Sequence, residues 1–334
     1  MEGYDAVLLD IDGTVVRGTA VVPGAPEVVN ELRQGGTSVQ FITNNAARGP
    51  AEVAEHLTAL GVRTTTEEVL TSGQAAVAVL VAQLPVGAVV LVVGTEALSA
   101  LVRTAGLRSV TRVDEDPTAV LQGHSPTTGW VHLAEACLAI RAGVMWVACN
   151  VDRTLPTERG LLPGNGAMVA ALRAATDREP LVAGKPERPL LDTAVNRTGA
   201  QRALVVGDRL DTDIAGACAA GLDSLLVLSG VADAASVLAA PPGQRPVYLG
   251  ADVRALHGSV ENARIRTCPG WRADVDGSSV ALHSGGTVGD PLDAVRTLCA
   301  VWWAERMGPA QVWACDDSAA VALEAVGLAA VRLR

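Results

Sequence analysis

The chain has 334 residues, of which 49% are hydrophobic and 19% charged, which suits two or three packed α/β units and excludes a disordered chain. The net charge is -10 and the isoelectric point is near 5.0, which disfavours nucleic acid and anionic membrane as partners. Six cysteines lie scattered with no CxxC pair, so neither a disulfide framework nor a zinc site is indicated.

Two segments bear on where the protein works. Residues 1–5 lack the basic start and apolar core of a signal peptide, so we expect a cytoplasmic protein. The apolar run Ala75–Gly94 is nearly long enough to span a bilayer, but turn residues at Gln83–Gly87 interrupt it. We therefore expect a helix, a turn and a strand there, with no membrane insertion.

The N-terminal stretch Val7–Val15 predicts a buried strand that ends in two acids. Its Val and Leu residues are typical of a parallel strand, and Asp10 and Asp12 come where that strand gives way to a Gly-containing turn. Open α/β sheets keep their chemistry at this edge. Two acids so close together repel each other unless a cation lies between them, so the spacing indicates a metal. An ordinary Asp-Gly turn is the alternative.

A second predicted strand, Ser38–Asn45, ends in a hydroxyl and two amides, those of Thr43, Asn44 and Asn45. A Thr hydroxyl and the backbone N–H groups that follow it are able to bind a phosphate oxygen. The alternative is that these residues cap the helix that starts near Pro50.

Helix and strand patterns alternate along the first 180 residues. Within this range, residues 84–180 are predicted to form a self-contained lobe without a catalytic acid. The expected helices are 26–34, 50–60, 70–83, 95–103, 135–142 and 166–175, and the expected strands in the lobe are 88–93, 130–133 and 145–149.

The only lysine of the chain, Lys185, follows in a Gly-Lys-Pro turn. An ammonium group on a constrained loop can neutralise both a carboxylate and a phosphate, whereas an ordinary surface lysine is the alternative.

A further apolar strand, Arg202–Gly207, ends at Asp208. Two strand ends that each present an Asp can hold one hard cation such as Mg²⁺, which takes a few oxygen ligands and keeps the rest as water. Asp211 and Asp213 come next, before a helix at 215–220. Negative charge at a helix N-terminus is favourable, which suits Asp211 better than Asp213.

In this order the motifs DxDGT, Thr-Asn-Asn, Gly-Lys-Pro and Gly-Asp-x4-Asp resemble the haloacid dehalogenase superfamily over residues 1 to about 240. The long insertion resembles the large cap of the NagD-like subclass, which includes phosphoglycolate and pyridoxal phosphatases. The resemblance implies an α/β fold: a Rossmann-like parallel-sheet core (1–83 and 181–243), an inserted α/β cap domain (84–180) and a C-terminal α+β extension (244–334).

The resemblance also implies Mg²⁺-dependent hydrolysis of a phosphate monoester through an aspartyl-phosphate. Asp10 is then the nucleophile, and Asp12 the general acid and base. The Mg²⁺ ligands are the carboxylates of Asp10 and Asp208 and the main-chain carbonyl of Asp12. The phosphoryl group is bound by Thr43 and Lys185, with Asn44 and Asn45 close to the substrate; Asp213 is a second-shell or alternate metal contact.

The last 90 residues depart from the usual family layout. They contain strand-like runs at 273–275 and 279–282, a helix at 292–305 with Trp302 and Trp303, and a closing helix and strand over 318–334. This extension resembles the tail of actinobacterial glycerol 3-phosphate phosphatases, which is weakly similar to part of the acetyltransferase fold. Gly285-Gly286-Thr287 is too short a signal for acetyl-CoA binding. We expect the tryptophans to serve packing or a homodimer.

A small phosphorylated metabolite is therefore the expected partner, with glycerol 3-phosphate as the leading substrate and phosphoglycolate and pyridoxal phosphate as alternatives. The polar loop 150–156 is a candidate for contacts to the non-phosphate end of that substrate. A regulatory protein with a vestigial phosphatase core and a bifunctional phosphatase and acyltransferase are the other two hypotheses.

Overall fold

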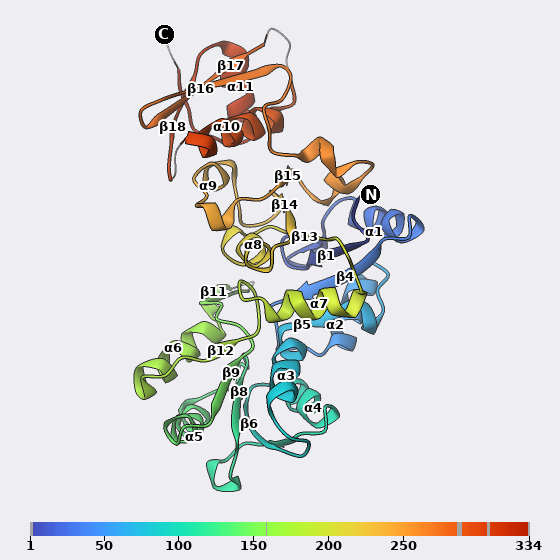
Figure 1. Ribbon diagram of the computed structural model, residues 1–334, viewed down its shortest axis with the longest axis vertical. Coiled ribbons are helices and arrows are strands. Elements are labelled where there is room, and N and C mark those ends of the chain that lie inside the picture. Colours follow the sequence, from blue (N-terminus) through green and yellow to red (C-terminus); the bar gives the residue numbers. More distant parts are fainter. Residues whose placement is uncertain (1–2, 158, 286–288, 306–307, 333–334) are drawn as a thin grey trace. The chain divides into compact units, whose positions relative to one another are not determined.

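The computed structural model describes residues 3–157, 159–285, 289–305 and 308–332 (Figure 1). The chain divides into two compact units. The first unit combines residues 1–38 with residues 201–334, and the second unit is residues 39–200. Each unit has its own parallel strands with polar side chains at their carboxyl ends.

The first unit contains four parallel strands in the order β15 (Tyr248–Gly250), β14 (Asp223–Val227), β13 (Ala203–Gly207) and β1 (Ala6–Asp10). Strand β1 pairs with β13 from Ala6 opposite Ala203 to Leu9 opposite Val206. All five residues of β1 are buried, as a parallel strand covered on both faces requires. The predicted apolar strands that end in Asp10 and Asp208 are therefore confirmed as neighbours.

Short helices complete this part of the first unit. Helix α1 (Ala25–Gln34) starts after Gly24, which adopts a left-handed φ of 83°, and has Pro26 in its first turn. The π-helical turn η3 (Leu210–Ile214) leads into α8 (Ala215–Ala220), and α9 (Ala234–Leu238) follows β14. The remaining elements are the pair β2 (Val16–Arg17) and β3 (Ala20–Val21) and the 3-10 turns η4 (Pro242–Gln244), η5 (Val253–Leu256) and η6 (Val260–Ala263).

The second unit holds the parallel pair β4 and β5 and a separate five-stranded parallel sheet in the order β12-β9-β8-β6-β7. The strands are β4 (Ser38–Thr43), β5 (Val69–Thr71), β6 (Val89–Val93), β7 (Arg108–Val110), β8 (Ala119–Gln122), β9 (Met145–Ala148) and β12 (Leu181–Val182). The helices are α2 (Pro50–Ala59), α3 (Ser72–Gln83), α4 (Glu96–Thr104), α5 (Trp130–Arg141), α6 (Asn165–Thr176) and α7 (Pro189–Thr198), with the 3-10 turns η1 (Thr66–Glu68) and η2 (Val113–Glu115).

Two features of the second unit differ from the prediction. The expected strand at 130–133 is the first turn of α5, because Trp130 and Val131 are exposed on a helix rather than buried in a sheet. The central strand of this region is β8, and part of the expected polar loop 150–156 belongs to a hairpin of β10 (Thr154–Thr157) and β11 (Gly160–Pro163). The run Ala75–Gly94 forms a helix, a turn and a strand, as predicted.

None of the helices in the described ranges is both long and apolar enough to cross a bilayer.

The C-terminal extension forms a four-stranded sheet, β16-β17-β18-β19, packed against two helices in the orange and red part of the chain (Figure 1). Its elements are β16 (Trp271–Asp276), β17 (Ser279–Ser284), α10 (Pro291–Glu305), β18 (Gln311–Ala314), α11 (Asp317–Ala325) and β19 (Val331–Arg332). The expected strands, helix and closing helix are confirmed, and β18 is an additional strand. Gly286 and Thr287 lie outside the described residues.

The extension shares a hydrophobic core with the parallel strands of the first unit. Trp271, Leu298 and Trp302 belong to the same buried cluster as Leu249 of β15 and Ile214 of η3. The extension is therefore continuous with the first unit.

Buried polar contacts reinforce this junction. The guanidinium of Arg296, only 6% exposed, donates from Nε and Nη2 to the Leu249 carbonyl at 3.1 and 2.7 Å. The indole N–H of Trp303 donates to the Leu238 carbonyl at 3.0 Å, and the Arg245 guanidinium lies 5.2 Å from the Trp303 ring centroid. Trp302 is 2% exposed, so the packing role expected for the tryptophans is confirmed within the chain.

Candidate active site

Three buried carboxylates gather at the carboxyl ends of β1 and β13. Asp10 ends β1, Asp208 follows β13 and Asp213 lies in η3; they are 8%, 1% and 1% exposed. One oxygen of each lies within 4.8 Å of the others. Three negative charges buried this closely repel each other, and a hard divalent cation that accepts oxygen ligands relieves the repulsion. The donor set fits Mg²⁺.

The backbone around Asp208 is built to hold its carboxylate. The Val231 N–H donates to Oδ2 at 2.7 Å, and the Ala232 N–H donates to the Asp208 main-chain carbonyl at 3.0 Å. Two glycines allow this close packing, because a Cβ on Gly13 or Gly230 would lie 2.3 or 2.0 Å from Oδ2. Gly13 also has a left-handed φ of 93°. The DxDG turn is therefore tied to the second acidic strand end.

The π-helical turn η3 contains both Asp211 and Asp213, but it places their side chains in different surroundings. Asp213 is buried and accepts a hydrogen bond from the Arg209 N–H at 3.1 Å. Asp211 is exposed, and its carboxylate accepts from Nε and Nη2 of Arg209 at 3.0 and 2.8 Å. Gly207 makes room for Asp213, since a Cβ there would lie 2.2 Å from the Asp213 Cγ. Asp213 thus lies in the same carboxylate cluster as Asp10 and Asp208.

Asp12 differs from these three acids because its side chain is exposed. Its backbone forms an isolated bridge to Val16, and the Gly13 N–H donates to the Val16 carbonyl at 2.7 Å, so the turn that carries Asp12 is fixed. The exposure of this side chain gives its carboxylate the access to solvent that a general acid and base requires.

Thr43 ends β4 in the second unit and is 4% exposed. Its hydroxyl accepts a hydrogen bond from the Asn45 N–H at 3.1 Å, and the Asn45 Oδ1 accepts from the Ala47 N–H at 2.9 Å. Helix α2 has Gly49 at its N-cap and no side-chain cap. The capping alternative for Thr43, Asn44 and Asn45 is therefore wrong.

Lys185 is 1% exposed, which excludes the alternative of an ordinary surface lysine. Its loop is held by Asn44, whose side-chain amide hydrogen bonds to the Lys185 main chain. Asn150 and Asp152, in the loop after β9, also contact Asn44. The sequence singled out this loop only as a candidate for substrate contacts; its contact with Asn44 depends on the folded geometry.

The cysteines do not supply an alternative nucleophile at this end of the second sheet. All six are free, and Cys149, directly after β9, is fully buried. Burial raises the pKa of the Cys149 thiol to about 12, so the thiolate is absent at neutral pH.

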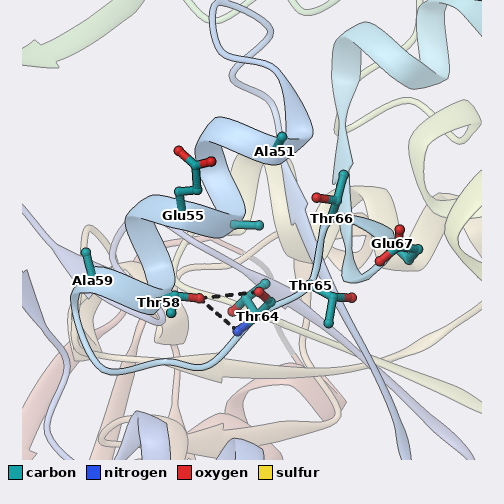
Figure 2. Close-up of a pocket in the computed structure, with 9 residues that line it drawn as sticks. Ala51, Glu55, Thr58, Ala59, Thr64, Thr65, Thr66 and Glu67 are labelled. Carbon is teal, nitrogen blue, oxygen red and sulfur yellow. Dashed lines mark hydrogen bonds between the residues drawn. The ribbon is translucent and has the colours of Figure 1, made fainter.

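An open pocket of about 600 Å³ lies between α2 and residues 64–67 (Figure 2). The Thr58 hydroxyl bonds to the Thr64 backbone on its wall, and Glu55 and Glu67 contribute carboxylates. None of the described residues that line it is basic, and its carboxylates repel a phosphate. We therefore do not assign the phosphate chemistry to this pocket.

Family models match three parts of the chain. A haloacid dehalogenase-like hydrolase model matches residues 7–108, and a second, HAD-hydrolase-like model matches residues 182–256. A GCN5-related N-acetyltransferase like domain matches residues 268–328, in agreement with the acetyltransferase-like tail expected from the sequence.

Relatives extend the match over nearly the whole chain. D-glycerol 3-phosphate phosphatase of Mycobacterium tuberculosis is 49% identical over 332 residues, which cover 96% of this chain and 93% of that protein. The crystal structure of glycerol phosphate phosphatase from M. tuberculosis in complex with magnesium has a TM-score of 0.93, with 50% identity and 98% of both chains covered. A 5'-nucleotidase of Bacillus subtilis is 37% identical over 69% of this chain and 90% of its own length. The chain belongs to the haloacid dehalogenase-like hydrolases.

Proposed function

We propose that this protein is a Mg²⁺-dependent phosphatase that hydrolyses glycerol 3-phosphate to glycerol and phosphate. The main observation in favour of this chemistry is the cluster of Asp10, Asp208 and Asp213. A site of oxygen ligands that includes a carboxylate at a strand end suits phosphoryl transfer. The substrate is proposed from the M. tuberculosis relative, which matches this chain through its C-terminal extension.

In the proposed first step, a carboxylate oxygen of Asp10 attacks phosphorus in line with the ester oxygen. The P–O ester bond breaks, and Asp12 gives its proton to the leaving alcohol, so that Asp10 carries the phosphoryl group. In the second step Asp12 takes a proton from water, the oxygen of which attacks the aspartyl-phosphate. Phosphate leaves and Asp10 is restored. The exposure of Asp12 supports both proton transfers.

Mg²⁺ would be held by Asp10, Asp208 and Asp213, together with the Asp12 carbonyl, and would supply positive charge that offsets the negative charge of the phosphoryl group. We propose Thr43 and Lys185 as further ligands of that group. A buried hydroxyl and a buried ammonium supply a donor and a positive charge, which stabilise the equatorial phosphoryl oxygens.

We further propose the cytoplasm as the location and residues 84–180 as the cap that selects the substrate. Six free cysteines suit a reducing compartment, and the net charge of -10 disfavours nucleic acid as a partner. Asn45 is proposed to lie near the substrate. The homodimer stays a prediction, which sedimentation velocity can check.

The test is phosphate release with Mg²⁺ from glycerol 3-phosphate, phosphoglycolate, pyridoxal phosphate and an aryl phosphate, with EDTA as control. We expect the highest kcat/KM for glycerol 3-phosphate and no release in EDTA. Asp10→Asn should lower kcat by on the order of 10⁴-fold or more while the thermal unfolding curve is retained, because the amide has a similar size but cannot attack phosphorus.

The substrate, the covalent mechanism and the enzyme activity itself would each be contradicted by a different result. Equal, feeble rates on all four esters would mean that the substrate is a different phosphate monoester. Turnover by Asp10→Asn at the wild-type rate would rule out the covalent mechanism. A complete lack of metal-dependent release would favour a regulatory protein with a vestigial core.

A further inference from the structure

The side chain of Asn44 holds the main chain of Lys185 at two points. Its Oδ1 accepts a hydrogen bond from the Lys185 N–H at 2.8 Å, and its Nδ2 donates to the Lys185 carbonyl at 2.9 Å. One amide therefore satisfies both polar backbone groups of the lysine. The two residues are 141 positions apart, so the contact ties the loop after β4 to the loop after β12.

Both N–H donors of the Asn44 side chain are occupied. Besides its bond to Lys185, Nδ2 donates a second hydrogen bond to the Asp152 carboxylate at 3.1 Å. A primary amide has two N–H donors, and these two contacts use both. The Asn44 main-chain carbonyl accepts from the Ser72 hydroxyl and from Asn150 Nδ2. No N–H of the side chain is left for a substrate.

The close approach of these segments depends on Gly184. A Cβ at that position would lie 2.6 Å from Asn44 Oδ1 and 2.6 Å from the Cys149 carbonyl oxygen. Even the smallest side chain would therefore separate the Asn44 amide from the Lys185 peptide.

We propose that Asn44 is a positioning residue that fixes Lys185 for phosphoryl transfer, and not a substrate ligand. The inference rests on the proposed function, in which the Lys185 ammonium binds the transferring group. A lysine side chain has four rotatable bonds, so its ammonium is accurately placed only when its backbone and its walls are fixed. A misplacement of about 1 Å in a catalytic group can lower the rate about 100-fold.

A double-mutant cycle tests this assignment. Asn44→Ala should lower kcat/KM by about 10- to 100-fold, and by the same factor for glycerol 3-phosphate and an aryl phosphate, because the lysine acts on the phosphoryl group that both esters share. In a Lys185→Ala background the same substitution should change kcat/KM by less than about twofold, since the group that Asn44 positions is then absent.

Gln40→Ala is the matched control. Gln40 is a buried amide on β4, the strand before Asn44; it is 3% exposed, and its Nε2 donates to the Glu67 carbonyl at 3.2 Å rather than to the Lys185 loop. Any loss that it causes should be the same with and without Lys185. If Asn44→Ala does not fold, as judged by thermal unfolding, Asn44→Ser replaces it in the cycle.

The possible results separate the inference from the function on which it rests. Independent, multiplicative losses from Asn44→Ala and Lys185→Ala would overturn the positioning role alone. A loss restricted to glycerol 3-phosphate would also overturn it, because that pattern indicates direct contact with the glycerol part. Wild-type activity in Lys185→Ala would remove the role proposed for the lysine, and the inference with it.

Discussion

Burial separates Asp213 from Asp211, although only one residue lies between them. Asp211 forms an exposed ion pair with Arg209, whereas Asp213 is 1% exposed and faces Asp10 and Asp208. An exposed pair of this kind contributes at most about 1 kcal/mol to stability. A buried carboxylate in a three-acid cluster has a much larger effect on its neighbours, so the two substitutions should differ sharply.

Asp213→Asn should weaken Mg²⁺ binding at least about tenfold, because it removes one of the negative charges that attract the ion. Asp211→Asn should leave the affinity within about twofold. Isothermal titration of the folded protein with Mg²⁺ measures both variants without turnover. Equal affinities for the two would mean that Asp213 is not part of the metal site.

At this scale the sequence predicted the residues better than their contacts. Asp10 and Asp208 follow apolar strands, and strand ends in a parallel sheet meet at one edge, so their proximity could be inferred. The contact between Asn44 and Lys185 could not be inferred. It depends on the angle at which two distant loops meet. The expectation that Asn44 lies close to the substrate came from the family resemblance alone.

At the scale of elements, a buried charge attaches α10 to β15, the edge strand of the parallel sheet. Arg296 donates twice to the Leu249 carbonyl, and its Nη1 donates to Asp293 at 2.6 Å. Leu249 in turn lies opposite Leu226, and Leu226 opposite Gly207, the residue before Asp208. The extension is therefore linked through three strands to the strand end that precedes Asp208.

Arg296→Ala should destabilise the protein by about 2 to 3 kcal/mol, because a buried carbonyl and a carboxylate both lose a charged donor. Arg272→Ala, in the same extension, should change stability by less than about 0.5 kcal/mol, since its ion pair with Asp274 is exposed. Urea unfolding of the two variants makes the comparison. A similar midpoint for both would contradict the anchoring role.

Helices with clear apolar spacing and end signals were predicted correctly, whereas a segment rich in strand-forming residues was wrongly predicted as a strand. Helices α1, α2 and α8 were expected within one or two residues of their bounds, since Pro, Gly and apolar spacing mark their ends. Residues 130–133 contain Trp, Val and Leu, which favour strands, yet the exposed Trp130 opens α5. The buried face of that helix comes later, at Ala136 and Ile140, and decides its conformation.

At the scale of the whole molecule, the C-terminal extension covers apolar side chains of the first unit that would otherwise be exposed to water. Leu238, Leu249 and Ile214 are buried against residues of α10 and the tail sheet. Full burial of one such side chain contributes roughly 1.5 to 3 kcal/mol. Exposure of several of them would exceed much of the roughly 5 to 15 kcal/mol by which a domain is stable.

A chain that ends at Arg266 should therefore aggregate or unfold well below the transition temperature of the full chain. Differential scanning calorimetry and size-exclusion chromatography would compare the two. The full chain carrying Arg272→Ala is a control for changes to the tail that leave the shared core intact. A monomeric 1–266 fragment that unfolds cooperatively near the full-length temperature would contradict the prediction.

The pairing of Ala6 with Ala203 has a consequence for how the chain is made. The strand that carries Asp10 is synthesised before residues 39–200, but its neighbour β13 leaves the ribosome only after that whole second unit has been translated. Contacts between such distant parts of a chain form slowly, because a long loop must close first. Residues 39–200 can pack before β13 is available to pair with β1. The second unit should therefore fold first during synthesis, and the acidic cluster should assemble last.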